Sequence, residues 1–345
     1  MLMAATQAPL VSASKVYKTF APVRPNADVP PGQWVLDGVS LTIRKGESVG
    51  LVGESGSGKS TLGRIILGLL PPTRGSVDYD GVDVWGAPER ERRAMRARCQ
   101  IVFQDPLGAL NPRRTIAESI ELPLINARWA RPSRTARVDE LLCRVGLDPR
   151  HKNRYPHQFS GGQCQRVVIA RAIALDPDFL FLDEPVSALD VSVQAQILNL
   201  LEDIRAALGL TCLFVSHDLK IVRHFCERTA VMFHGQLVEM GASEAIFDAP
   251  LHPYTRALRA AVLDVRGAAP LAGAGDTPDG DAHVANAAGC RYAPRCPLRM
   301  DVCANFAPPL ERIAADHWLA CHAAAEIAGP PCTFPEFFKE VEPAE

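Results

Sequence analysis

One eight-residue segment, Gly53-Glu-Ser-Gly-Ser-Gly-Lys-Ser60, constrains this chain more than any other part of its sequence. It matches the phosphate-loop pattern G-x-x-x-x-G-K-[ST]. The apolar segment 48–52 before it predicts a short strand, and the apolar segment 61–70 after it predicts a helix. A strand, a glycine-rich turn and a helix in this order present backbone N–H groups and the positive end of a helix to phosphate oxygens. The segment therefore predicts nucleotide binding in an α/β fold.

Two side chains of this loop have specific predicted roles. We expect Lys59 to reach the β- and γ-phosphates and Ser60 to bind Mg²⁺. An ordinary glycine-rich turn is the alternative, and the flanking strand and helix argue against it. The residues predicted to contact the nucleotide here are Gly53, Ser55, Gly56, Gly58, Lys59, Ser60 and Thr61.

A second motif is an apolar strand, residues 179–182, that ends in Asp183 and Glu184. A fully apolar strand suits a sheet buried on both faces. We predict that Asp183 supports Mg²⁺ and that Glu184 orients or deprotonates the attacking water. The alternative is that these are two solvated acidic side chains at a strand end without a role in catalysis. Because the chain also contains a phosphate loop, a role in hydrolysis is the better interpretation.

The third motif is Ser160-Gly-Gly-Gln163. Ser160 and Gln163 fit a capping box that opens a helix. The two glycines, Gly161 and Gly162, leave the backbone bare at the helix N-terminus, which is typical of an anion site. Because one chain has no reason to own two γ-phosphate sites, we expect this helix to face the nucleotide of a partner in a dimer. A plain capped helix is the alternative.

The remaining pattern indicates an α/β core with a parallel sheet, because apolar strands alternate with helices. Segment 212–215 reads as a buried strand and segment 191–208 as an amphipathic helix. Segment 230–238 reads as a hairpin around Gly235. Residues 21–33 carry four prolines and predict a loop between two early strands.

Charge and hydropathy exclude several classes of protein. The 37 Lys and Arg against 39 Asp and Glu give a formal charge of −2, which argues against nucleic acid as a partner. The arginines of segment 90–98 alternate with Glu89 and Glu91, as on a solvated helix face. The best apolar run, 65–70, is far shorter than the ~20 residues of a membrane span. The N-terminal segment is weakly apolar and no basic segment precedes it, so we expect a cytosolic chain without a secretory signal.

We predict three parts along the chain. Residues 10–265 form the nucleotide-binding domain, with a helical subdomain at about 105–165. Residues 267–289 contain eight Ala and five Gly and read as a flexible linker. Residues 290–345, here called the cysteine-rich region, hold five of the ten cysteines and read as a small separate domain.

Four cysteines of this region, Cys290, Cys296, Cys303 and Cys321, are candidate metal ligands, and Cys332 is left over. Four thiolates can hold a [4Fe–4S] cluster or Zn²⁺. The lack of a C-x-x-C pair argues against a zinc ribbon, and a region without metal stays possible. A region with so few large apolar side chains favours a stabilising metal.

The phosphate loop, Gln104, the 160–163 motif, Asp183–Glu184, Asp190 and His217 together resemble the ATP-binding-cassette (ABC) ATPases over about residues 10–260. The resemblance implies a P-loop α/β core, an antiparallel β-subdomain near the N-terminus and a helical subdomain that carries the 160–163 signature. It also implies two cassettes packed head to tail with two ATP molecules between them.

The same resemblance implies roles for further residues. Gln104 would contact Mg²⁺ and the attacking water and link to the transmembrane partner. Asp190 would lie at the dimer seam, and His217 would contact the γ-phosphate, although outside this series it reads as a loop histidine. An aromatic near the N-terminus would stack on adenine, with Tyr17 as our choice and Phe20 second.

Four segments are similar to the oligopeptide and dipeptide importer ATPases: 103–107, 110–113, 153–157 and 251–258. Cys164 in the signature resembles the F-type oligopeptide subunit. The sequence around the four tail cysteines is similar to the C-terminal extension of these ATPases. This resemblance implies a [4Fe–4S] cluster.

The sequence thus predicts an ATPase that drives peptide uptake from the cytoplasmic face of the inner (plasma) membrane, as a peripheral subunit. Expected partners are a paralogous D-type ATPase in a heterodimer, two transmembrane permease subunits and an extracytoplasmic solute-binding protein. Nickel or glutathione import is an alternative within the family. A soluble ABC ATPase in DNA repair or on ribosomes is an alternative from another class, and a redox-sensing tail is a third.

Overall fold

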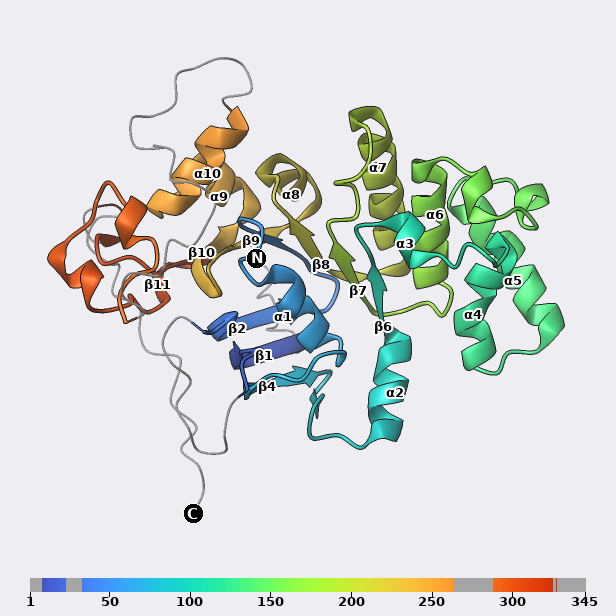
Figure 1. The fold of residues 1–345 in the computed structure, drawn as a ribbon, viewed down its shortest axis with the longest axis horizontal. Coiled ribbons are helices and arrows are strands. Elements are labelled where there is room, and N and C mark those ends of the chain that lie inside the picture. The colour runs from blue at the N-terminus through green and yellow to red at the C-terminus, as the bar shows by residue number, and fades with distance from the viewer. Residues whose placement is uncertain (1–7, 23–32, 264–287, 325–326, 328–345) are drawn as a thin grey trace, which may run out of the picture.

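The computed structural model describes residues 8–22, 33–263, 288–324 and 327, as two β-sheets with helices around them (Figure 1). Most of the predicted loop 21–33, nearly all of the predicted linker 267–289, and Cys332 lie outside the described residues. None of the described helices is both long and apolar enough to cross a lipid bilayer.

The larger sheet contains, within the described ranges, eight strands in the order β11-β12-β10-β9-β3-β8-β7-β6. Strands β6, β7, β8, β3 and β9 are parallel to their neighbours, whereas β10, β12 and β11 continue the sheet antiparallel. The parallel strands are almost wholly buried, which explains their continuous apolar sequences. The strands are β3 (Ser48–Val52), β6 (Cys99–Val102), β7 (Phe179–Asp183), β8 (Thr211–Ser216), β9 (Arg228–Phe233), β10 (Gln236–Ala242), β11 (Glu311–Ala314) and β12 (His317–Leu319).

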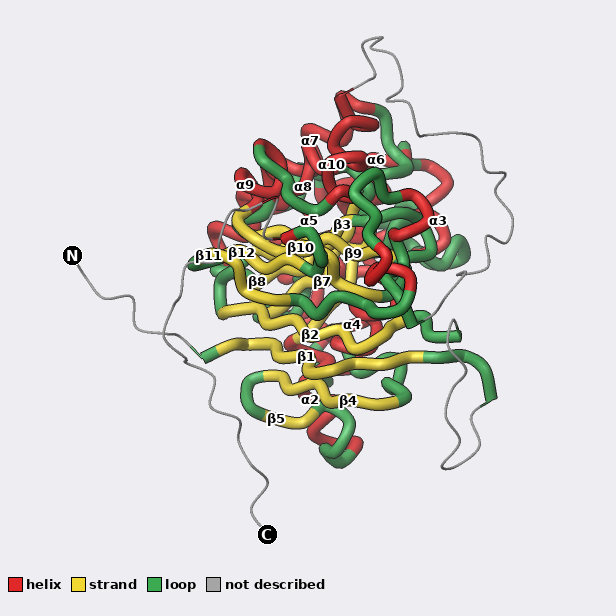
Figure 2. Tube along the Cα trace, turned by 90° about the vertical axis from the view of Figure 1, so that its left-hand side faces the viewer, coloured by secondary structure: helices red, strands yellow, loops and turns green. Residues whose placement is uncertain are grey.

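The smaller sheet is antiparallel, in the order β2-β1-β4-β5, and lies below the larger one in Figure 2. It is the β-subdomain that the family resemblance implies. Val11, Val39 and Val77 are fully buried between this sheet and the core. Its strands are β1 (Pro9–Lys18), β2 (Leu36–Arg44), β4 (Arg74–Tyr79) and β5 (Val82–Asp83).

The helices cover the core sheet and build a helical subdomain from α3 to α6, at the right of Figure 1. Ile120, Leu141 and Val168 are fully buried in the core cluster that this subdomain shares with the larger sheet. The helices are α1 (Lys59–Ile66), α2 (Glu89–Arg98), α3 (Pro106–Ala109), α4 (Ile116–Asn126), α5 (Arg131–Arg144), α6 (Gly161–Ala172), α7 (Val191–Leu208), α8 (Leu219–Phe225), α9 (Ser243–Asp248) and α10 (Pro253–Leu263), with the 3₁₀ turns η1 (Pro149–His151), η2 (Pro156–Gln158), η4 (Ala293–Arg295) and η5 (Asp301–Ala304).

Helix α1 is shorter at its C-terminal end than the predicted 61–70 and begins earlier, at Lys59. Its end has a local cause, because Gly68 takes the left-handed φ of +66° just after the C-cap Leu67. The apolar run continues past the helix, since Leu69 and Leu70 donate their N–H groups back to the carbonyl of Arg64.

The described part of the cysteine-rich region does not form a sheet of its own. Its hairpin, β11 and β12, joins the core sheet, where Glu239 and Met240 of β10 pair with Leu319 and Trp318. A hairpin on β10 covers backbone groups that would otherwise form an open sheet edge. The expected separate domain is therefore, in its described residues, an extension of the core sheet.

Candidate nucleotide-binding and hydrolysis site

The phosphate loop lies between β3 and α1 and packs against the end of β9 and the residue before β2. A Cβ at Gly53 would lie 2.1 Å from the carbonyl oxygen of Met232, and one at Gly58 would lie 2.7 Å from that of Val35. Gly58, the N-cap of α1, also has a φ of +102°, which favours glycine. The two glycines that open and close the motif are thus required by space and by backbone conformation.

Lys59 lies inside the loop with only 4% of its surface exposed. Its Nζ donates to the carbonyls of Gly53 at 2.8 Å and Glu54 at 2.7 Å. Burial lowers the pKa of Lys59, and the negative charges of Glu184, Asp183 and Glu54 oppose that change. A buried ammonium next to bare backbone N–H groups makes this loop suited to an anion such as a phosphate.

Ser60 and Asp183 bring two oxygens together beside Lys59, because the Ser60 hydroxyl donates to the Asp183 carboxylate at 2.6 Å. Burial raises the pKa of Asp183, and the bond from Ser60 works against that rise. A hydroxyl and one carboxylate are suitable ligands for Mg²⁺, which fills its other positions with water and phosphate oxygens. These two residues therefore fit the predicted magnesium role.

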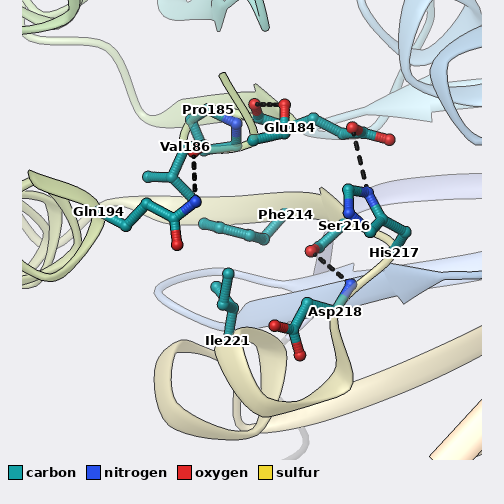
Figure 3. A pocket seen from close by; sticks show the side chains of 10 residues that line it. Glu184, Pro185, Val186, Gln194, Phe214, Ser216, His217, Asp218 and Ile221 are labelled. Carbon is teal, nitrogen blue, oxygen red and sulfur yellow. Dashed lines mark hydrogen bonds and ion pairs between the residues drawn. The ribbon is translucent and has the colours of Figure 1, made fainter. Parts of the chain in front are cut away.

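Glu184 forms a polar cluster with Gln104 and His217, and Figure 3 shows its contact with His217 from close by. Its Oε2 accepts from Gln104 Nε2 at 3.2 Å and lies 3.3 Å from His217 Nδ1. A cavity of about 80 Å³ lies beside Glu184 and His217. Glu184 also has a φ of +48°, a left-handed conformation that is uncommon outside glycine and often found at functional sites. The cluster can orient a small polar molecule such as water.

The side chain of Gln104 therefore contacts Glu184. Among the described residues, no hydrogen bond joins it to Ser60 or Asp183. The predicted contact of Gln104 with Mg²⁺ stays a prediction, while its position next to the candidate base agrees with the predicted contact to the attacking water.

The signature residues lie apart from the phosphate loop within this chain. Ser160 accepts from the Gln163 N–H at 3.3 Å, and Gln163 accepts from the Ser160 N–H at 3.0 Å, which is the expected capping box. Gly161 and Gly162 pack near Leu189 and Val193, where a Cβ on Gly162 would lie 2.5 Å from the valine. Helix α6 is separated from α1 by β6 and β7 in Figure 1. The signature therefore opens an exposed helix end that is free to face a partner.

Asp190 lies beside this exposed end, as the N-cap of α7. Its side chain is exposed and makes no capping bond. This placement is compatible with the predicted role at a dimer seam.

The side chain of Tyr17 packs inside the β-subdomain. Its ring meets Trp34 edge-on at 5.3 Å, and its hydroxyl fills the space beside Gly38. Phe20, just after β1, is 64% exposed, and the Lys18 ammonium lies 5.2 Å from the centre of its ring. The structure thus favours Phe20 over our first choice, Tyr17, as the aromatic available to a nucleotide base. The proline-rich insertion hid this difference in the sequence.

The four tail cysteines approach one another but remain free thiols. Burial raises the pKa of Cys321, and the nearby Cys296, Cys290 and Cys303 raise it further. Within the part of the chain that the structure describes, however, no three His, Cys, Asp or Glu side chains are arranged to hold a metal ion. The donor chemistry fits a cluster, but the observed arrangement does not support the expected [4Fe–4S] site.

The sequence reasoning did not identify Glu54, Tyr254 or Arg295 as site residues. The Glu54 N–H donates to the Tyr254 hydroxyl at 2.9 Å, and the Glu54 carboxylate pairs with Arg295 at 3.1 Å. The sequence signals were the position of Glu54 inside the phosphate loop, of Tyr254 in the 251–258 segment and of Arg295 next to Cys296.

Two family models match this chain: "ABC transporter" over residues 36–187 and "Oligopeptide/dipeptide transporter, C-terminal region" over residues 238–303. A putative peptide import ATP-binding protein of Brucella abortus is 49% identical over 292 residues, covering 83% of this chain and 86% of that protein. The chain belongs to the ABC transporter family of ATP-binding proteins. A putative peptide import ATP-binding protein of Brucella ovis is 47% identical and covers 83% of this ABC ATPase and 91% of its own length.

Solved structures agree with the fold of this ABC ATPase. CbiO1 from Clostridium perfringens, part of the ABC transporter complex CbiONQ, has a TM-score of 0.62 at 27% identity, covering 70% of this chain and 91% of that one. The ATP-binding cassette MJ0796, solved as a dimer in a post-hydrolysis state with ADP and Pi, has a TM-score of 0.59 at 35% identity, covering 68% and 98%. Together with the family match, these likenesses confirm the predicted fold class and ATPase activity.

Proposed function

We propose that this ABC ATPase powers the import of oligopeptides or dipeptides through separate permease subunits. The observation that carries the proposal is the match of residues 238–303 to the oligopeptide/dipeptide transporter C-terminal region, next to a cassette core. The two Brucella relatives, both described as putative peptide import ATP-binding proteins, support the same cargo class.

In the proposed cycle, the loop N–H groups and Lys59 bind the phosphates, and Phe20 stacks on the base. Ser60 and Asp183 hold Mg²⁺, which neutralises phosphate charge when bound. Glu184 accepts a proton from the attacking water, while Gln104 and His217 keep its carboxylate in place. Binding of ATP closes a pair of cassettes, and hydrolysis reopens it.

The partner cassette would supply its own signature to this nucleotide. The exposed, capped start of α6 at Ser160–Gln163 supports this arrangement. From the resemblance to F-type subunits we infer a heterodimer with a paralogous D-type subunit. Co-expression of tagged and untagged chains tests this, because a homodimer would retain the untagged copy of this chain in the absence of a paralogue.

A groove next to Gln104 is the surface we assign to the permease. Its cavity of about 810 Å³ lies between α2, β6, α4 and α6. It is lined by apolar Ile101, Phe103 and Leu122 and by Arg90, Arg93 and Arg96 of α2. Phe103 precedes Gln104 in the chain, so a helix in this groove would contact the backbone that carries Gln104. This contact would place the ATPase on the cytoplasmic face of the inner membrane, where it would sediment with membranes only when the permeases are co-expressed.

The four tail cysteines are our candidates for an iron–sulfur cluster, supported by their number and their proximity. Iron and sulfide analysis of anaerobically purified full-length protein tests this. A metal-free protein of normal ATPase activity would refute the cluster.

Uptake of a labelled di- to pentapeptide panel tests the cargo. Cells lacking this chain are complemented with the wild type or with Glu184→Gln, and we expect uptake only with the wild type. Uptake that does not depend on the chain would remove peptides as cargo. Nickel and glutathione, added to the same panel, would then identify the alternatives within the family.

A further inference from the structure

One peptide group of the phosphate loop, between Gly53 and Glu54, is held at both of its polar atoms. The Gly53 carbonyl accepts from Lys59 Nζ at 2.8 Å, and the Glu54 N–H donates to the Tyr254 hydroxyl oxygen at 2.9 Å. Because the peptide unit is planar and rigid, a rotation that breaks one bond disturbs the other. The Tyr254 hydroxyl is therefore linked through this unit to the ammonium of Lys59.

Tyr254 is itself held firmly at the start of α10. It is 1% exposed, and its backbone N–H donates to His252 Nδ1 at 3.0 Å. Its ring packs against Phe233 at 4.6 Å and Tyr292 at 5.5 Å between ring centres. Burial raises the pKa of Tyr254, so its hydroxyl stays neutral. A side chain this constrained can hold the loop in one position.

A buried carboxylate anchors the start of α10. Glu239 of β10 is fully buried and accepts from the N–H groups of Leu251 at 2.8 Å and His252 at 3.0 Å. His317 of β12 lies 2.8 Å from the same carboxylate. Burial alone would raise the pKa of Glu239, but these hydrogen bonds outweigh it and lower the pKa. An ionised carboxylate next to helix N–H groups stabilises that helix end.

A second residue reaches the same loop from the cysteine-rich region. Arg295, between Cys290 and Cys296, pairs with the Glu54 carboxylate at 3.1 Å. Its guanidinium also lies 5.7 Å from the centre of the Tyr292 ring. Because the Arg295 and Glu54 side chains are 53% and 39% exposed, we expect this contact to be weak.

We propose that Tyr254 is a positioning residue for the phosphate loop: it fixes the Gly53–Glu54 peptide and, through that peptide, the phosphate-binding ammonium of Lys59. Arg295 adds a weaker contact to the same residue. The proposal rests on the ATP-binding part of the proposed function and does not depend on the transported solute. It predicts a defect in nucleotide affinity with little change in the chemical step.

Tyr254→Phe in the full-length chain tests the proposal, because it removes only the hydroxyl. We expect the Kd for fluorescent N-methylanthraniloyl-ATP and the KM for ATP to rise about 3- to 10-fold, as for one net hydrogen bond. We expect kcat at saturating ATP to stay within about twofold. Arg295→Gln should raise the KM by less than about threefold, since exposed ion pairs contribute little.

Tyr292→Phe is the matched control. It removes a hydroxyl from the same aromatic cluster, and among the described residues this hydroxyl makes no hydrogen bond to the loop. Its nucleotide affinity should equal that of the wild type. Equal affinities in the two Tyr→Phe variants, or a fall in kcat at unchanged KM, would overturn the positioning role. A wild-type chain that fails to bind ATP would instead refute the function on which the proposal rests.

Discussion

The hydrolysis site and the cysteine-rich region carry equally visible motifs, yet their side chains are assembled to different degrees. At the hydrolysis site, Ser60 already bonds Asp183 and Gln104 already bonds Glu184. In the cysteine-rich region, the four thiols are near one another but unbonded.

The scaffold explains this difference. Gln104, Asp183 and His217 follow or end the neighbouring parallel strands β6, β7 and β8, so their side chains meet at one edge of a buried sheet. The strand ends therefore set this geometry through the backbone of the sheet. The cysteines lie in loops, 3₁₀ turns and the end of a hairpin, where a bound metal would have to complete the arrangement. The sheet thus positions the side chains of the hydrolysis site, whereas the proximity of the four cysteines does not by itself orient their thiols.

Glu184→Gln should have the largest effect, because it leaves the assembled site in place and removes only the base. We expect ATP hydrolysis to fall about 10²- to 10⁴-fold while nucleotide binding is retained. Steady-state ATPase assays and nucleotide binding on the same preparation measure both. Glu244→Gln, an exposed acid in the first turn of α9, is the control and should keep full activity. Near wild-type turnover in Glu184→Gln would remove the base role.

Lys59→Ala should weaken nucleotide binding itself, by about 10- to 150-fold, because charge-assisted bonds to the phosphates are lost. Equilibrium binding of fluorescent ATP measures the change. The matched control is Lys152→Ala, which removes a partly exposed lysine paired with Asp139 in the helical subdomain. Unchanged affinity in Lys59→Ala would contradict the assignment of the phosphate loop.

The local structure around the candidate site could be predicted from the sequence because strand–turn–helix motifs specify their own local geometry. Strand β3 was predicted at its observed bounds, and Asp183 ends β7 as the apolar run indicates. The four cysteines were also visible as a set, but spacing along a loop does not determine how thiols are oriented. The pairing of β12 with β10, which joins the described part of the cysteine-rich region to the core sheet, could not be predicted for a related reason, since it is a long-range contact without a local signal.

Two further outcomes depended on packing that a sequence does not display. Tyr17 and Phe20 are both aromatic and lie three residues apart, and only the packing of Tyr17 on Trp34 and Gly38 and the exposure of Phe20 separate their roles. Tyr254 follows the phosphate loop by 200 residues, and its hydroxyl reaches that loop only because α10 packs beside it. Such contacts need the tertiary structure.

Cys303→Ser tests whether the cysteine-rich region binds a metal. If the cysteine-rich region is completed by metal, the variant should lose bound iron, while its ATP affinity changes by less than about threefold because Arg295 and Tyr254 remain. Iron analysis and nucleotide binding on the full-length protein measure both. The exposed Cys143 provides the control, as Cys143→Ser should keep its iron. Equal iron content in both variants would exclude Cys303 as a ligand.

His252 lies where the two regions meet, and its titration affects folding stability and not the chemistry of the site. Burial lowers the pKa of His252 to about 4, although the neighbouring Glu239 carboxylate opposes that change. In the unfolded chain His252 therefore becomes protonated near pH 6.5, whereas in the folded chain it becomes protonated only near pH 4. The free energy of unfolding is therefore unaffected by this titration above pH 6.5. It decreases as the pH falls, by about 2 kcal/mol at pH 5.

His252→Asn removes this titration while keeping a side-chain acceptor for the Tyr254 N–H and the backbone N–H that reaches Glu239. Urea unfolding of both proteins at pH 7.5 and pH 5 measures the difference. We expect the wild type to lose about 2 kcal/mol more than the variant between these values. A parallel loss in both proteins would mean that His252 is protonated in the folded state at pH 5. The polar link between α10 and β10 would then not depend on a neutral imidazole at His252.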